Sequence, residues 1–78
     1  MDAKEIERLI KRRFPDALVT IRDLAGDGDH YAARVVAESF RGISRVERTR
    51  RVYAALGGRM GGELHALQLT TAVPAGVE

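Results

Sequence analysis

Two histidines are the side chains best suited to chemistry near neutral pH, and the sequence contains no cysteine. His65 begins the stretch HALQLTT, in which Leu67 and Leu69 share its parity. Without thiolates, the chain cannot form a disulfide, a zinc finger or an iron–sulfur cluster ligated by its own cysteines, so a metal site needs His, carboxylates or a partner's ligands. By spacing alone, His65 either offers a ligand nitrogen at a strand end or caps an apolar face by hydrogen-bonding a loop carbonyl, and the cap is favoured.

His30 follows the acidic, glycine-rich run GDGD. Gly26 and Gly28 give this loop conformational freedom, and Asp27 and Asp29 are hard oxygen ligands that compete with imidazole for a metal ion. These residues leave two interpretations open, a solvated loop histidine and a metal ligand.

Arginine is concentrated in one part of the sequence. The segment 41–59 contains a single acid, Glu47, whereas the charged residues of DLAGDGD (23–29) are all acids. We therefore expect one surface that attracts anions and another that repels them. The basic segment contains six arginines: Arg41, Arg45, Arg48, Arg50, Arg51 and Arg59.

Four of these arginines are candidates for a binding surface. Arg45, Arg48 and Arg51 or Arg50 are predicted on the outer side of a helix. Arg45, Arg48, Arg51 and Arg59 could contact nucleic-acid phosphates or a protein partner. A solvated helix face is the simpler interpretation. The run GRMG (58–61) fits the GxxG loop of KH domains, but a KH loop leads into a full helix and too few residues remain before the final strand for one.

The length of 78 residues predicts a single domain, residues 1–78, with a flexible tail over about 74–78. A chain this short buries only about 60–65% of its unfolded surface, so a deep enclosed active site is not expected. No catalytic triad, P-loop or dinucleotide fingerprint occurs, and we predict no catalytic activity and no small-molecule substrate. Because no segment reaches the roughly 20 apolar residues that span a bilayer and no signal peptide is present, we expect a soluble, cytoplasmic protein without membrane binding.

Local sequence chemistry predicts a helix followed by a hairpin. Asp2 suits a helix N-cap, apolar residues then recur at helical spacing, and Pro15 ends the helix. The segments 17–24 and 30–40 are rich in alternating, small and β-branched residues, as in strands, and AGDGD (25–29) supplies the turn between them.

A second helix and a final strand complete the pattern. Ser44 and Glu47 have the spacing of a capping box, Gly57 or Gly58 is the expected stop, and one short helical turn at most fits before a strand over 65–72. A helical crossover favours parallel pairing of that strand. The order αββα(α)β predicts an α+β sandwich, with helices on one face of a three-stranded mixed sheet. The helix face expected toward the sheet consists of Val46, Thr49, Tyr53 and Leu56.

Several spaced motifs, spread over about residues 5–74, closely resemble the BolA family. They are a GDG-type loop with a His before an aromatic residue (GDGDHY), the turn into a helix FRGISRV, the helix segment VYAAL, and the final strand HALQLTT. The resemblance implies a fold similar to the KH domain, with αββααβ order.

The resemblance also implies a function. BolA-like proteins partner with monothiol glutaredoxins and share a [2Fe–2S] cluster with them, the glutaredoxin cysteine and its glutathione binding on one side. The BolA ligand that opens the final strand falls on His65, and the second ligand, from the loop between the first two strands, falls on His30. The isolated chain is then expected to hold no tightly bound cofactor. Family members are also described as transcriptional or morphological regulators in bacteria, so the alternative function is a DNA- or RNA-binding transcriptional regulator that uses the KH-like fold and the arginine-rich helix.

Overall fold

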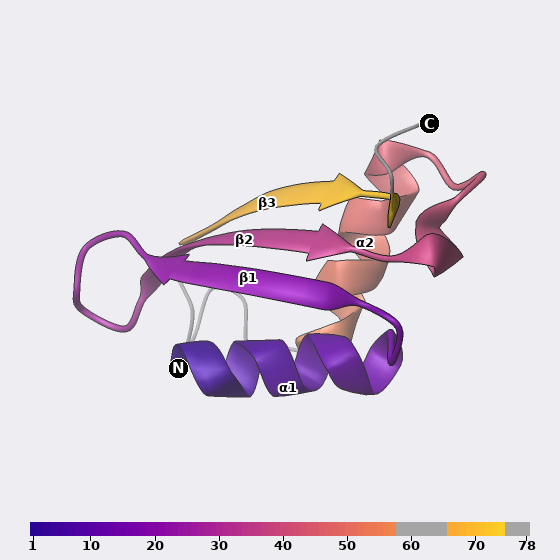
Figure 1. Ribbon diagram of the computed structural model, residues 1–78. Coiled ribbons are helices and arrows are strands. Elements are labelled where there is room, and N and C mark those ends of the chain that lie inside the picture. The colour runs from indigo at the N-terminus through magenta and orange to yellow at the C-terminus, as the bar shows by residue number, and fades with distance from the viewer. Residues whose placement is uncertain (58–65, 75–78) are drawn as a thin grey trace.

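The structure is a computed structural model that describes residues 1–57 and 66–74 (Figure 1). The sheet has the order β1 (Leu18–Asp23), β2 (His30–Val36) and β3 (Ala66–Ala72), with β1 antiparallel and β3 parallel to β2. The predicted α+β fold with a mixed three-stranded sheet is therefore confirmed. The further helical turn predicted before the last strand falls on residues outside the described ranges. The elements are α1 (Ala3–Arg13), β1 (Leu18–Asp23), β2 (His30–Val36), the 3-10 helix η1 (Glu38–Phe40), α2 (Arg45–Ala55) and β3 (Ala66–Ala72).

Side-chain caps begin both α-helices, as predicted. The carboxylate of Asp2 accepts a hydrogen bond from the Glu5 N–H at 2.9 Å, and the hydroxyl of Ser44 accepts one from the Glu47 N–H at 3.2 Å. These bonds satisfy N–H groups that the helices leave without a backbone partner. Gly57 follows α2 with a φ of 65°, a left-handed conformation that glycine adopts without strain, and it ends the helix as expected.

The β1–β2 hairpin is closed by a carboxylate at the end of β1. Asp23 accepts hydrogen bonds from the Gly26 N–H at 2.8 Å and the Gly28 N–H at 3.0 Å. Both glycines have a φ of 70°, which explains why the turn uses glycine there. The predicted hairpin is thereby confirmed.

The second strand is shorter than the sequence predicted. It ends at Val36 instead of continuing to Phe40, because the chain then folds into η1. Asp16, beyond the end of α1, accepts hydrogen bonds from the Ser39 N–H at 3.2 Å and hydroxyl at 3.1 Å. Phe40 turns inward and packs edge-on against Phe14, with ring centroids 5.0 Å apart. A tertiary contact therefore replaces strand pairing over the last residues of that segment.

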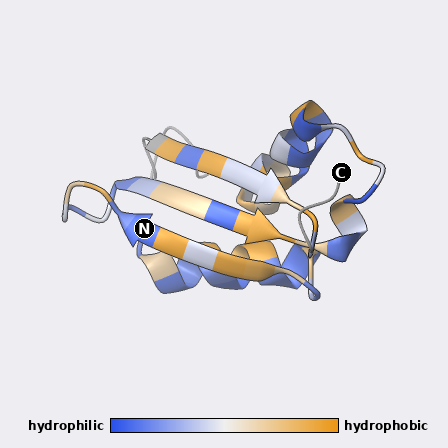
Figure 2. Cartoon of the chain, turned by 45° about the horizontal axis from the view of Figure 1, so that its top comes forward, coloured by the Kyte–Doolittle hydropathy of each residue, from blue (hydrophilic) through white to orange (hydrophobic). Residues whose placement is uncertain are grey.

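The core lies between the sheet and the two α-helices, which occupy the same side of the sheet (Figure 1). Along the strands, hydrophobic residues on the core side alternate with more hydrophilic ones (Figure 2). No helix in the described part of the chain covers the other face, where Thr20, Arg34 and Thr70 lie side by side in register. None of the described helices has the length and apolarity needed to cross a membrane. The buried core consists of Ile6, Ile10, Phe14, Ala17, Val19, Tyr31, Ala33, Val35, Ala37, Phe40, Val52, Leu56, Leu67 and Val73.

The buried face of α2 differs from the prediction. Leu56 is buried and Tyr53 packs at the edge of the core, but Val46, which was predicted to face the sheet, is 72% exposed. The buried line runs instead through Arg48, Val52 and Leu56, which are spaced four residues apart. The prediction for Val46 is wrong because the sequence pattern treated Arg48 as a solvent-facing residue.

Candidate metal-ligand edge and basic helix

The starts of β2 and β3 lie side by side. In the parallel register, the Cα of His30 pairs with that of Ala66, and Tyr31 pairs with Leu67. Ala66 is the residue that follows His65 in the sequence. His65 itself lies outside the described residues, so its role as a ligand stays a prediction. Neither residues 1–57 nor residues 66–74 contain a group of three or more His, Asp or Glu side chains that could hold a metal ion.

The imidazole of His30 contacts a carboxylate of its own loop. Its Nδ1 lies 3.0 Å from Oδ2 of Asp27, and 45% of the His30 side chain is exposed. Partial desolvation raises the pKa of the Asp27 carboxyl, but hydrogen bonds from the Asp29 N–H and the His30 ring outweigh it and hold that pKa below its usual range. When Nδ1 donates to Asp27, Nε2 carries the free lone pair, which is the arrangement of a carboxylate-oriented metal-ligating histidine.

The loop that carries His30 is also attached to the first residue. The Met1 amino group donates a hydrogen bond to the Gly28 carbonyl at 3.2 Å, and the Tyr31 hydroxyl donates one to the Met1 carbonyl at 2.6 Å. Tyr31 is almost completely buried, and this burial, assisted by nearby carboxylates, raises the pKa of its phenol. Tyr31 was not among the predicted site residues, although its position in the strand directly after His30 is a signal that could have identified it.

The predicted arginine surface is only partly present. Arg48 is 4% exposed, its Nε donates a hydrogen bond to the Ile43 carbonyl at 2.8 Å, and its guanidinium carbon lies 5.8 Å from the centre of the Phe40 ring. The prediction that Arg48 lies on the outer side of the helix is therefore wrong. The groups that contact the guanidinium, the Ile43 carbonyl and the Phe40 ring, come from the loop and the 3-10 helix before α2.

The other candidate arginines differ in their surroundings. Arg51 is half-buried and its Nε lies 3.0 Å from Oε2 of Glu47. Arg45 is exposed, as predicted, and Arg59 lies outside the described residues. Of the three candidate arginines in the described part of the chain, only Arg45 is therefore as exposed as the sequence predicted.

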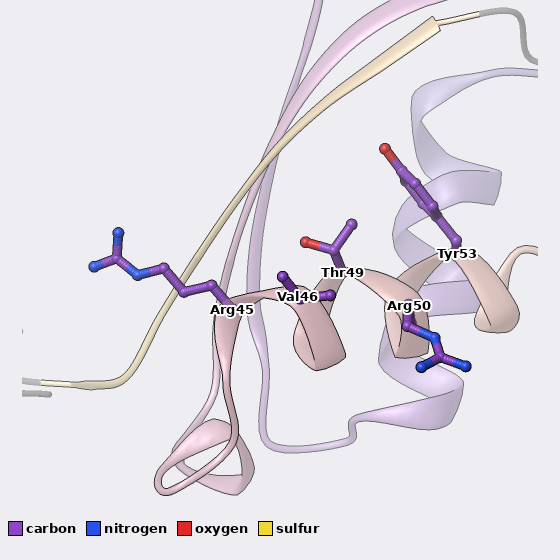
Figure 3. Close-up of a pocket in the computed structure, with 5 residues that line it drawn as sticks. All are labelled: Arg45, Val46, Thr49, Arg50 and Tyr53. Atoms are coloured by element: carbon purple, nitrogen blue, oxygen red, sulfur yellow. The ribbon is translucent and has the colours of Figure 1, made fainter.

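A hollow of about 350 Å³ runs along α2 on the side that contains Arg45. It is lined by Arg45, Val46, Thr49, Arg50 and Tyr53 (Figure 3). The hydroxyl of Tyr53 donates a long hydrogen bond, 3.4 Å, to the carbonyl of Leu67 in β3. The hollow therefore reaches from the first turn of α2 toward the beginning of β3.

The element order, the mixed sheet and the single covered face define a small α+β domain with a histidine-bearing edge where two parallel strands begin. The sequence model of the BolA-like protein family matches residues 11–76. The chain belongs to the BolA-like protein family.

Relatives and solved structures agree with this assignment. An uncharacterized protein of Rickettsia prowazekii is 34% identical over 71 residues, which cover 91% of this chain and 92% of that protein. BolA-like protein 1 of Homo sapiens is 40% identical over 50 residues, or 64% of this chain but only 36% of the human protein.

Two solved structures are similar over nearly the whole chain. BolA1 from Arabidopsis thaliana has a TM-score of 0.84 at 25% identity and covers 97% of this chain and 95% of its own. A bolA protein homologue from Coxiella burnetii has a TM-score of 0.78 at 33% identity, covering 95% and 92%.

Proposed function

We propose that this chain is an adaptor that pairs with a monothiol glutaredoxin and supplies His65 and His30 as ligands to a shared [2Fe–2S] cluster, in iron–sulfur trafficking or iron-linked regulation. It has no catalytic activity of its own in this proposal. Membership of the BolA-like family supports it, and one structural observation carries it: the β2–β3 register pairs His30 with the residue that follows His65.

The donor set suits such a shared cluster. The chain has no cysteine, so its contribution is imidazole nitrogen, while the partner's cysteine and glutathione provide sulfur. Asp27 fixes one nitrogen of His30 and leaves the other for a metal ion. A cluster with imidazole ligands in place of two thiolates has a higher reduction potential. Because imidazole binds a metal only when it is deprotonated, acid weakens its ligation.

Spectroscopy of the reconstituted heterodimer tests the proposal. The protein is mixed with a monothiol glutaredoxin, glutathione, iron and sulfide, and its visible circular dichroism is compared with that of the glutaredoxin homodimer. We expect His65→Ala to abolish or alter the heterodimer spectrum and His30→Ala to have a smaller effect. Gln68→Ala, on an exposed position of β3, is the control and should leave the spectrum unchanged.

Two outcomes contradict parts of this proposal. An unchanged spectrum with His65→Ala removes that residue from the ligand set. A larger effect of His30→Ala reverses the order of importance of the two ligands.

Duplex DNA is the weaker candidate partner. The guanidinium of Arg48 is buried against Ile43 and Phe40, and that of Arg51 is engaged by Glu47. These contacts leave less positive charge on α2 for phosphates than the sequence indicated, and phosphate contacts supply most of the affinity of a non-specific DNA-binding protein. We therefore place DNA binding second.

A further inference from the structure

The hollow on α2 combines exposed apolar surface with positive charge. Val46, in the first turn of α2, is 72% exposed, more than the other exposed large hydrophobic residues in the described part of the chain, Leu18 and Leu24. Thr49 and Tyr53 continue the surface along the same side of α2 (Figure 3). Val46 is therefore part of a continuous apolar lining, and contiguous exposed apolar surface is a feature of surfaces that are covered by a partner.

Two guanidinium groups flank this apolar strip. Arg45 is exposed, and 77% of the Arg50 side chain is exposed, with its Nη1 3.6 Å from Oε1 of Glu47. In Figure 3 the two arginine side chains extend away from the strip in different directions. A ligand that fits this pattern has an apolar side chain for the Val46–Tyr53 strip and carboxylates near it for the arginines.

We propose that the α2 hollow is a docking site for an acidic segment of another protein, with an apolar residue between carboxylates. His30 is not among the described residues that line the hollow, and the inference uses no cluster ligand. The link from Tyr53 to the Leu67 carbonyl places one end of the hollow beside the start of β3, so that a protein docked there also covers the edge at which β2 and β3 begin.

A second copy of this chain is a poorer occupant than another protein. Its acidic loop has an exposed Leu24 among aspartates, but two carboxylates of that loop, those of Asp23 and Asp27, already accept hydrogen bonds within the loop. Asp23 accepts from loop N–H groups, and Asp27 accepts from the Asp29 N–H and contacts His30. A nucleic acid is also a poorer occupant, because the strip between the two arginines offers mainly apolar surface to a phosphate backbone.

The test is an NMR titration of the isotope-labelled protein with three blocked synthetic peptides. The first has a central leucine flanked on both sides by glutamates, the second has serine in place of leucine, and the third has lysines in place of the glutamates. We expect the first peptide to shift the Val46 methyl, Thr49 and Tyr53 signals. It should bind about tenfold more tightly than the serine peptide, because the leucine is buried on binding, and its binding should weaken several-fold at high salt.

Matched variants locate the binding. Val46→Asp and Arg50→Glu should each weaken binding of the leucine–glutamate peptide about tenfold or more. Their controls are Leu18→Asp and Arg34→Glu, which place the same changes at exposed positions of β1 and β2. These controls should bind the peptide as the wild type does, and a dispersed NMR spectrum shows that each variant is folded.

Four results overturn the proposal. The first is the absence of shifts around Val46 with the leucine–glutamate peptide, and the second is an equal loss of binding in the control variants. The third is a set of shifts that depend on protein concentration without peptide, which would assign the hollow to a second copy. The fourth is displacement of the peptide by duplex DNA that shifts the same signals. The His65→Ala protein separates this inference from the proposed function. It should lose the cluster spectrum but still bind the peptide.

Discussion

Replacing Arg48 by Ala should destabilise the fold instead of removing a phosphate contact. The side chain is 4% exposed, it donates to the Ile43 carbonyl at 2.8 Å, and its guanidinium faces the Phe40 ring. The substitution leaves the Ile43 carbonyl without this donor and removes the aliphatic stem from the packing around Phe40.

The magnitude follows from these contacts. A hydrogen bond from a charged donor contributes about 1.5–3 kcal/mol, and a cation–π contact contributes about 0.5–2 kcal/mol. Releasing a buried charge into water offsets part of this loss. We therefore expect Arg48→Ala to lower the free energy of unfolding by about 2–3 kcal/mol, a large fraction of the roughly 5 kcal/mol available to a small domain.

Urea unfolding followed by circular dichroism measures this change. Arg51→Ala is the matched control, because the Arg51 side chain is 38% exposed and pairs with Glu47 on the surface, and it should cost no more than about 0.5 kcal/mol. Arg48→Met separates the causes, since it keeps much of the stem but has no donor. The reasoning is refuted if Arg48→Ala unfolds at the wild-type urea concentration while reducing the salt dependence of DNA binding.

Three other predictions concern stability. Leu56→Ala should lower the free energy of unfolding by about 2–4 kcal/mol because the side chain is buried, whereas Val46→Ala should change it by less than about 0.5 kcal/mol. Equal effects in urea titrations would mean that the buried face of α2 is misassigned. Ser44→Ala should cost about 1 kcal/mol through loss of the N-cap, measured in the same way, and a neutral result would contradict the cap. A hydrogen bond from the Ser39 N–H outweighs desolvation and lowers the pKa of Asp16, so this carboxylate stabilises the fold above its ordinary pKa, and the contribution disappears as the pH falls through the lower folded-state value. Asp16→Asn should therefore reduce the loss of stability between roughly pH 5 and 3. An unchanged dependence of the unfolding free energy on pH in that range would argue against this role.

Features set by neighbouring residues could be predicted from the sequence, and features set by distant ones could not. Asp2 and Ser44 cap their helices because each carboxylate or hydroxyl reaches an N–H three residues away. The end of β2 depends on Asp16 and Ser39, which are 23 residues apart. The residue pattern along β2 does not reveal such a contact, so the predicted strand was too long at its C-terminal end.

The candidate site shows the same division. Alternation along the final strand and a helical crossover predicted parallel pairing, and this pairing brings Ala66 opposite His30. The burial of Arg48 was missed because its charge indicated exposure, whereas Ile43 and Phe40, from the loop and 3-10 helix before α2, supply a carbonyl and a ring around it. A charged residue in line with buried apolar residues four positions away is the signal that would have identified it.

The parallel pairing of β2 and β3 has a consequence for the order of folding. The β1–β2 hairpin joins neighbouring segments and can form early, but β3 reaches β2 only after the whole of α2 has crossed the sheet. Because the entropy of closing that long loop must be overcome first, the His30–Ala66 edge is among the last parts of the fold to be assembled. A ligand pair built across this edge would exist only in the completed fold, so under the proposed function a nascent or partly unfolded chain could not ligate a cluster prematurely.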